Sequence, residues 1–177
     1  MSHTHTAIAV FHMHETAEAA IRDLEKGGFD MQKLSIVGRD YHTEEHVVGY
    51  YNTGDRMQSW GQRGAFWGAL WGILFGSAFF VLPGLGPILM AGPLVAVLVS
   101  AMEGAVVVGG LSALGAALAS IGIPENTIVQ YEGELKVGKF LVIVHGTHDE
   151  VQRAKNLLDA STSTSTKIHS VPDPVAV

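Results

Sequence analysis

Residues 64–82 read GAFWGALWGILFGSAFFVL, and this uncharged stretch sets the architecture that we predict for the chain. About 19 residues at 1.5 Å each span roughly the 30 Å hydrocarbon thickness of a bilayer. A turn rich in proline and glycine, PGLGP, follows at residues 83–87 and would break a helix. A second apolar run returns over residues 88–108. The sequence therefore predicts a transmembrane hairpin of two helices, residues 64–82 and 88–108.

The basic residues that flank this hairpin indicate its orientation. Arg56 and Arg63 come just before the first predicted span, and no Lys or Arg follows until Lys136. By the positive-inside rule, both flanks are cytosolic. The start of the chain lacks a basic segment followed by an apolar core and a cleavage site, so no signal peptide is predicted. We expect an inner (cytoplasmic) membrane protein with both termini in the cytosol.

Small residues recur at every fourth position along both predicted helices. In lipid, such a row allows helix backbones to approach closely. The spacing predicts either that the two helices of one hairpin pack together or that hairpins from several copies form a homo-oligomer, and it does not choose between these outcomes. The residues of this glycine zipper are Gly64, Gly68, Gly72, Gly76, Ala101, Ala105, Gly109 and Ala113.

Outside the hairpin, the sequence predicts an α+β fold in two similar halves. A strand–helix–strand pattern occurs in residues 7–37 and again in residues 140–171. This order predicts a ferredoxin-like split βαβ-βαβ sandwich, an antiparallel four-stranded sheet with helices on one face, into which the hairpin is inserted. A further helix is predicted over residues 125–136. Residues 109–121 either continue the second span or lie on the surface of the sheet.

These patterns divide the chain into six segments. The predicted segments are a first βαβ half (1–46), an interfacial linker (47–63), the transmembrane hairpin (64–108), connecting helices (109–138), a second βαβ half (139–171) and a tail (172–177).

Composition excludes several classes of function. The formal net charge is −6 and no run of Lys and Arg occurs, which argues against a nucleic-acid surface. The absence of cysteine removes disulfides and thiolate chemistry. The sequence has no nucleophile elbow, P-loop lysine, dinucleotide fingerprint or HExxH motif. We therefore predict a protein that is not an enzyme and needs no cofactor.

Three segments of the chain carry a resemblance to a known family. They read VVGYYNTGDRMQSWGQRGAFWGALWGILFG at residues 47–76, LPGLGPILMAGPL at residues 82–94 and SIGIPENTIVQYE at residues 120–132. In these segments the chain resembles bacterial general-stress or low-temperature-induced membrane proteins, a domain of unknown function. The resemblance covers residues 7–158. It implies a stress-associated membrane protein with no assigned reaction and no catalytic residue.

Glu103 is the one charged residue of the predicted hairpin. Near the bilayer midplane, a carboxylate is expensive and becomes a candidate for handling protons or ions. Near the interface, it would simply reach the lipid headgroups.

Histidine is frequent, and four of the nine histidines follow predicted strands. We expect the first and third strands to be parallel neighbours, so that His12, His14, His145 and His148 converge at one edge of the sheet and offer imidazoles to a metal ion. The alternative is that they are exposed polar or pH-responsive side chains, since no spacing matches a zinc signature. No metal site is therefore assigned.

The predicted linker brings aromatic and basic residues to the membrane edge. Such residues contact lipid headgroups or a partner, or else the segment is a plain interfacial connection. The residues are Tyr50, Tyr51, Arg56, Trp60 and Arg63.

The leading hypothesis is a non-enzymatic, stress-associated integral membrane protein that oligomerises through its glycine zipper. Its expected contacts are membrane lipid and further copies of itself, with any protein partner unknown, and its cytosolic domain would serve as a binding or assembly module. One alternative is a small channel or ion-coupled transporter that uses Glu103. Another is a soluble self-assembling particle whose hairpins enclose lipid or quinone.

Overall fold

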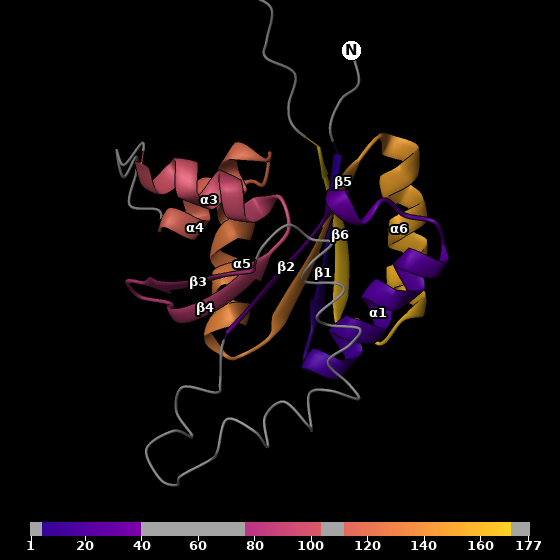
Figure 1. Cartoon of the computed structure of the whole chain (residues 1–177), viewed down its shortest axis with the longest axis horizontal. Helices are drawn as coiled ribbons and strands as arrows, with labels where there is room; N and C mark the ends of the chain where they lie inside the picture. The colour runs from indigo at the N-terminus through magenta and orange to yellow at the C-terminus, as the bar shows by residue number, and fades with distance from the viewer. Residues whose placement is uncertain (1–4, 40–76, 104–111, 171–177) are drawn as a thin grey trace, which may run out of the picture.

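The computed structural model describes residues 5–39, 77–103 and 112–170. In these residues, a six-stranded sheet lies between two layers of helices, as Figure 1 shows. The strands are β1 (His5–Phe11), β2 (Leu34–Arg39), β3 (Ser77–Leu82), β4 (Gly86–Ala91), β5 (Phe140–Gly146) and β6 (Ser165–Ser170). The helices are α1 (His14–Lys26), α3 (Leu94–Glu103), α4 (Ala113–Ser120), α5 (Glu125–Lys136) and α6 (His148–Ala160), and a short 3-10 helix, η1 (Met31–Lys33), precedes β2.

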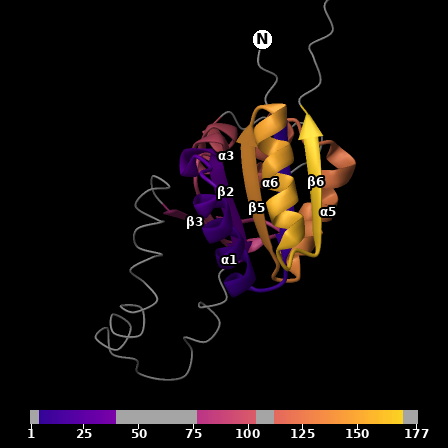
Figure 2. The ribbon, with the colours of Figure 1, turned by 90° about the vertical axis from the view of Figure 1, so that its right-hand side faces the viewer.

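Helices α1 and α6 cover one face of the sheet because each carries a single apolar stripe. The stripe of α1 consists of Ala17, Ala20, Ile21 and Leu24, all of which are buried. Helix α6 contributes a similar stripe that includes Leu158. The two helices lie side by side over the strands in Figure 2.

The start of α6 is fixed by its own sequence. The Thr147 hydroxyl accepts a hydrogen bond from the Glu150 backbone N–H at 3.3 Å, and the Glu150 carboxylate accepts one from the Thr147 N–H at 2.9 Å. This capping box satisfies two backbone donors that the first turn of a helix leaves unpaired. The same carboxylate forms an ion pair with Lys33 at 2.9 Å, which joins α6 to η1.

The six strands follow the order β3-β4-β2-β5-β1-β6, and every neighbouring pair is antiparallel. Alternate residues of β1 point to opposite faces. Ile8 and Val10 pack against the layer of α3, α4 and α5, whereas Ala7, Ala9 and Phe11 pack against α1 and α6. Since both faces are covered, a strand such as β1 is apolar along nearly its whole length.

The predicted α+β class is confirmed, as a mixed fold with an antiparallel sheet. Two features of the prediction were wrong. The sheet has six strands rather than four, and helices in the described part cover both of its faces rather than one.

The predicted transmembrane hairpin is also corrected. The prediction places the end of one long helix and the start of another within residues 77–91. The structure has strands β3 and β4 there, paired from Ser77↔Ala91 to Leu82↔Gly86. The expected turn between them is present. Pro83 precedes Gly84, whose φ is +81°, and the Leu85 N–H donates to the Leu82 carbonyl at 3.2 Å. Proline followed by a glycine of positive φ is typical of a type II turn.

The second predicted span, residues 88–108, is divided by Gly92 and Pro93. Gly92 has a φ of +96° and lies between β4 and α3. Helix α3 then begins beside β2, where the Leu94 N–H donates to the buried Ser35 hydroxyl at 3.1 Å. A side chain of a neighbouring strand therefore caps this helix.

Helices α4 and α5 complete the second layer. Leu114 and Leu118 of α4 are buried together with sheet residues, so this part of residues 109–121 lies on the sheet, as one of the two predicted alternatives had it. Helix α5 has the predicted bounds. Among the described residues, no helix combines the length and the apolar composition needed to cross a bilayer.

Candidate functional site

The sheet has one end at which histidines gather, which we call the histidine end. It consists of the first residues of β1, the last residues of β5 and β6, and the first residue of α6. Thr6 stands at its centre, opposite His145 of β5 on one side and His169 of β6 on the other. Since directly paired residues of antiparallel strands share a face, these three side chains form one row.

Two hydrogen bonds hold this row in place. The hydroxyl of Thr6, which is fully buried, lies 3.2 Å from His145 Nδ1. The hydroxyl of Tyr131 lies 2.9 Å from His169 Nε2 and joins α5 to β6. The rings of Tyr131 and His169 meet edge to face, with centroids 5.9 Å apart. Both imidazoles therefore have a hydroxyl partner on the face that α5 covers.

Burial decides the protonation of these groups. It lowers the pKa of His145, because the charged imidazolium loses water contacts. Burial also lowers the pKa of His169, and the charge of Lys167 adds to this effect. Burial raises the pKa of Tyr131 to about 12, so the phenol keeps its proton at neutral pH. At neutral pH the Tyr131 O–H can therefore donate to the uncharged His169 ring.

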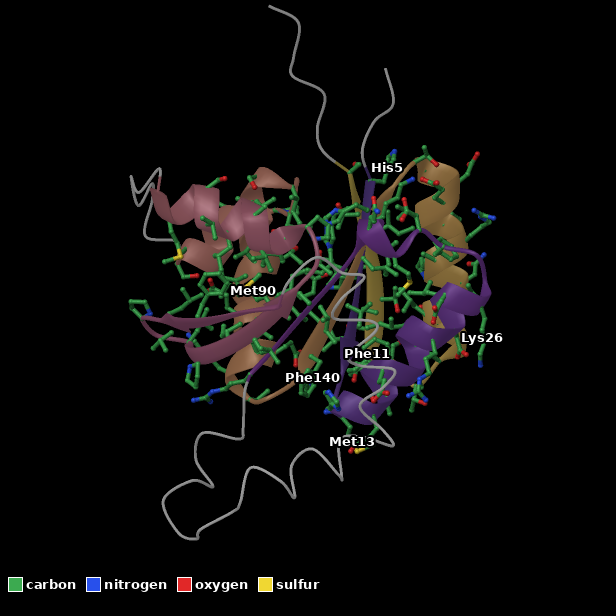
Figure 3. All side chains as sticks on the ribbon, in the orientation of Figure 1. His5, Phe11, Met13, Lys26, Met90 and Phe140 are labelled. Atoms are coloured by element: carbon green, nitrogen blue, oxygen red, sulfur yellow. The ribbon has the colours of Figure 1, made fainter. Side chains whose placement is uncertain are left out.

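The opposite face of the histidine end carries another pair of imidazoles. The rings of His5 and His148 meet edge to face, with centroids 5.1 Å apart. Figure 3 shows His5 where β1 begins, near the start of α6. The sequence did not single out this pair.

The structure corrects the predicted convergence of four histidines. β1 and β5 are neighbours, but they run antiparallel rather than parallel. His12 and His14 therefore lie at the opposite end of the sheet from His145 and His148. Figure 3 places Met13, the residue between the first two, at that far end. His14 instead packs against the Phe140 ring at a centroid distance of 5.7 Å.

Metal-ligating side chains do not cluster in the described ranges: these ranges hold no group of three or more His, Cys, Asp or Glu residues placed to share a metal ion.

Most residues of the predicted zipper and all those of the predicted linker fall outside the described ranges. Ala101 belongs to α3 and Ala113 to α4, so the structure places them on two short helices rather than on one span. Glu103 is the last residue of α3, a helix of ten residues. The residues outside the described part are Gly64, Gly68, Gly72, Gly76, Ala105, Gly109, Tyr50, Tyr51, Arg56, Trp60 and Arg63.

A second notable region is the charge-free stretch, residues 77–102, which contains no Asp, Glu, Lys or Arg. Although much of it lies in the core, some of its apolar side chains are exposed. The exposed fraction is 70% for Val81 of β3, 39% for Val99 and 44% for Met102, both of α3. A helix that is apolar on all sides is normally covered on all sides.

Comparison with protein families links the first part of the chain to stress proteins. Residues 6–80 match the model of the heat induced stress protein YflT domain. The matched region runs from β1 into β3 and covers less than half of the chain. It supports the predicted link to bacterial stress proteins and says nothing of a membrane or a glycine zipper. No curated protein and no solved structure matches the chain.

Sequence reasoning missed the contacts that build the histidine end. His145 was considered as a metal ligand, whereas Thr6, Tyr131 and His169 were not considered at all. The contact between Thr6 and His145 depends on strand register. The contact between Tyr131 and His169 depends on the packing of α5, since the two residues are separated by 38 positions in the chain. The alternation of β6 places His169 on the same face as Lys167, and this pattern was the sequence signal for the face on which His169 lies.

Proposed function

We propose that this protein belongs to the stress response, acts by binding rather than by catalysis, and assembles with further copies of itself. The family match of residues 6–80 supports the link to stress. The observation that supports self-assembly is the charge-free stretch, which leaves Val81, Val99 and Met102 exposed. Exposed apolar residues within a stretch free of charge favour association.

The charge of the chain supports the same choice of surface. With a net charge of −6, two copies repel each other at long range. The repulsion is smallest where the contact surface itself holds no charged group. Residues 77–102 meet this condition, whereas α1, α5 and α6 all carry carboxylates.

Sedimentation velocity of the full chain tests this proposal. We expect the wild type to sediment as an oligomer, and the double variant Val81→Lys/Val99→Lys to shift toward the monomer, because it places a charge on each exposed part of the charge-free stretch, β3 and α3. The matched control is Val129→Lys/Val137→Lys. Val129 lies on α5 and is 63% exposed, and Val137 follows directly after α5 and is 68% exposed. This control should sediment like the wild type.

Two results would contradict the proposal. A monomeric wild type at concentrations well above those in cells would exclude self-assembly. An oligomer that both double variants leave unchanged would show that the contact lies elsewhere than on the charge-free stretch.

We also infer that the two βαβ halves together form a ferredoxin-like unit, to which β3 and β4 add an extension. Two observations support this. The strands β2-β5-β1-β6 lie in the order expected of a split βαβ pair, and α1 and α6 lie on the same face. An experimental structure that places either helix on the other face would contradict it.

The two alternative functions receive no support from the described residues. The channel hypothesis required a second span around Glu103, and strand β4 with the ten-residue α3 replaces that span. The particle hypothesis required apolar helices that form a hairpin, and residues 77–91 form a β-hairpin instead. Residence at the inner membrane stays a prediction from the sequence.

A further inference from the structure

The two outer strands of the sheet differ in chemistry. β6 reads STKIHS, with the charged Lys167 and hydroxyl side chains along an exposed strand. β3 reads SAFFVL and contains neither charge nor proline. Figure 1 shows them at opposite sides of the sheet. Natural proteins protect outer strands with lysine, proline or bulges, because an unprotected edge pairs with other chains.

The backbone of β3 explains why such protection matters. β3 pairs with β4 on one side, and among the residues that the structure describes, no strand pairs with its other side. An edge strand presents alternate N–H and C=O groups to whatever lies beside it. Its exposed Val81 adds apolar surface on the face away from α3, while Leu82 is buried in the layer of α3, α4 and α5.

We propose that β3 is the contact between two copies of this chain. The two β3 strands pair antiparallel across a two-fold axis perpendicular to the sheet, so that two six-stranded sheets become one continuous sheet. This inference rests on the proposed self-assembly and specifies its geometry.

The strand that pairs with the free edge of β3 is the β3 strand of a second copy, because β3 is complementary to itself. A two-fold axis perpendicular to the sheet keeps each face on its own side. Phe80 and Leu82 of one copy, which pack with the layer of α3, α4 and α5, then lie beside the same residues of its partner. Apolar side chains meet apolar side chains on both faces, and no charge is buried. For a chain with a net charge of −6, this neutral edge makes a contact at little electrostatic cost.

The absence of cysteine makes a direct test available. Phe80→Cys and Val81→Cys, introduced one at a time into the full chain, are treated with a short bis-maleimide cross-linker under native conditions. Val129→Cys, on α5, is the matched control with a similarly exposed position. We expect at least one of the β3 variants to cross-link into a dimer in high yield, and the α5 control to remain at least tenfold lower.

A second variant separates the pairing from the wider proposal. Val81→Lys adds the protective charge that β3 lacks, and because this side chain is exposed, the fold should be kept. We expect it to shift the sedimentation of the dimer to that of the monomer, while Val129→Lys does not.

The outcomes distinguish the two proposals. A wild-type oligomer in which neither cysteine of β3 cross-links would overturn strand pairing but leave self-assembly intact. A monomeric wild type would overturn both. A cysteine at position 81 that resists a small maleimide in the monomer would also overturn the pairing, because residues of the same chain then cover the edge.

Discussion

At the scale of single residues, Gly92 is a position that has no room for a side chain. Its φ is +96°, and a Cβ at this position would lie 2.1 Å from the Leu34 carbonyl oxygen and 2.8 Å from Ser35 Cα. Gly92→Ala should lower the free energy of unfolding by more than about 2 kcal/mol, from backbone strain and steric overlap. Urea denaturation of the purified chain measures this loss.

Gly133 provides the control because it lies within α5 and a Cβ there would meet no atom within 4 Å. Gly133→Ala should raise stability by about 0.5–1 kcal/mol through helix propensity. If the two alanines had the same effect, the steric account of the junction between β4 and α3 would be wrong.

At the level of helices and strands, the capping box of α6 is the clearest local determinant. Thr147→Ala removes the acceptor for the Glu150 N–H and should destabilise the protein by about 1 kcal/mol. Thr162→Ala, in the turn after α6, should change stability by less than about 0.5 kcal/mol, since surface substitutions away from such features usually do. Thermal and urea unfolding of the two variants side by side check this, and equal losses would argue against a capping role.

The elements that the sequence predicted well are those with a local signal. The signal for α5, a proline followed by a helical pattern, lies within its own segment, so its predicted bounds agree with the structure. The strands β1, β2, β5 and β6 were also anticipated, though not their register.

The charge-free stretch was misjudged for a physical reason. A run without charge has the same composition whether it crosses a bilayer or supplies both a buried strand pair and the helices packed on it. Two signals favoured the second outcome: short runs rich in aromatic and branched residues on both sides of Pro83-Gly84, and the break at Gly92-Pro93. The histidine end was predictable only in part, because antiparallel register decides which histidines meet.

For the protein as a whole, the buried imidazoles of His145 and His169 predict a loss of stability in mild acid. Burial lowers both pKa values, so below about pH 6.5 the unfolded chain takes up protons that the folded chain does not. Their contribution to stability is fully present above that pH and is lost as the pH falls through the folded-state values. We expect the melting temperature to fall between about pH 7 and pH 5.

The variant His145→Asn should flatten this decline, because asparagine can still bond to the Thr6 hydroxyl and does not titrate. His12→Gln, at an exposed position, should leave the decline unchanged. Differential scanning calorimetry across this pH range measures both. An identical slope in all three proteins would show that buried imidazoles do not govern acid sensitivity.

The order β2-β5-β1 has a consequence for how the protein is made. β1 and β2 leave the ribosome before the strand that lies between them, because β5 begins about a hundred residues after β2 ends. Until then, the nascent chain holds two apolar strands without their shared neighbour, and it exposes the aggregation-prone edges that chaperones bind. The region that matches the stress-protein family ends in β3 and so stops short of this strand. The sheet of the described residues can therefore be completed only after β5 has been synthesised and has inserted between β1 and β2.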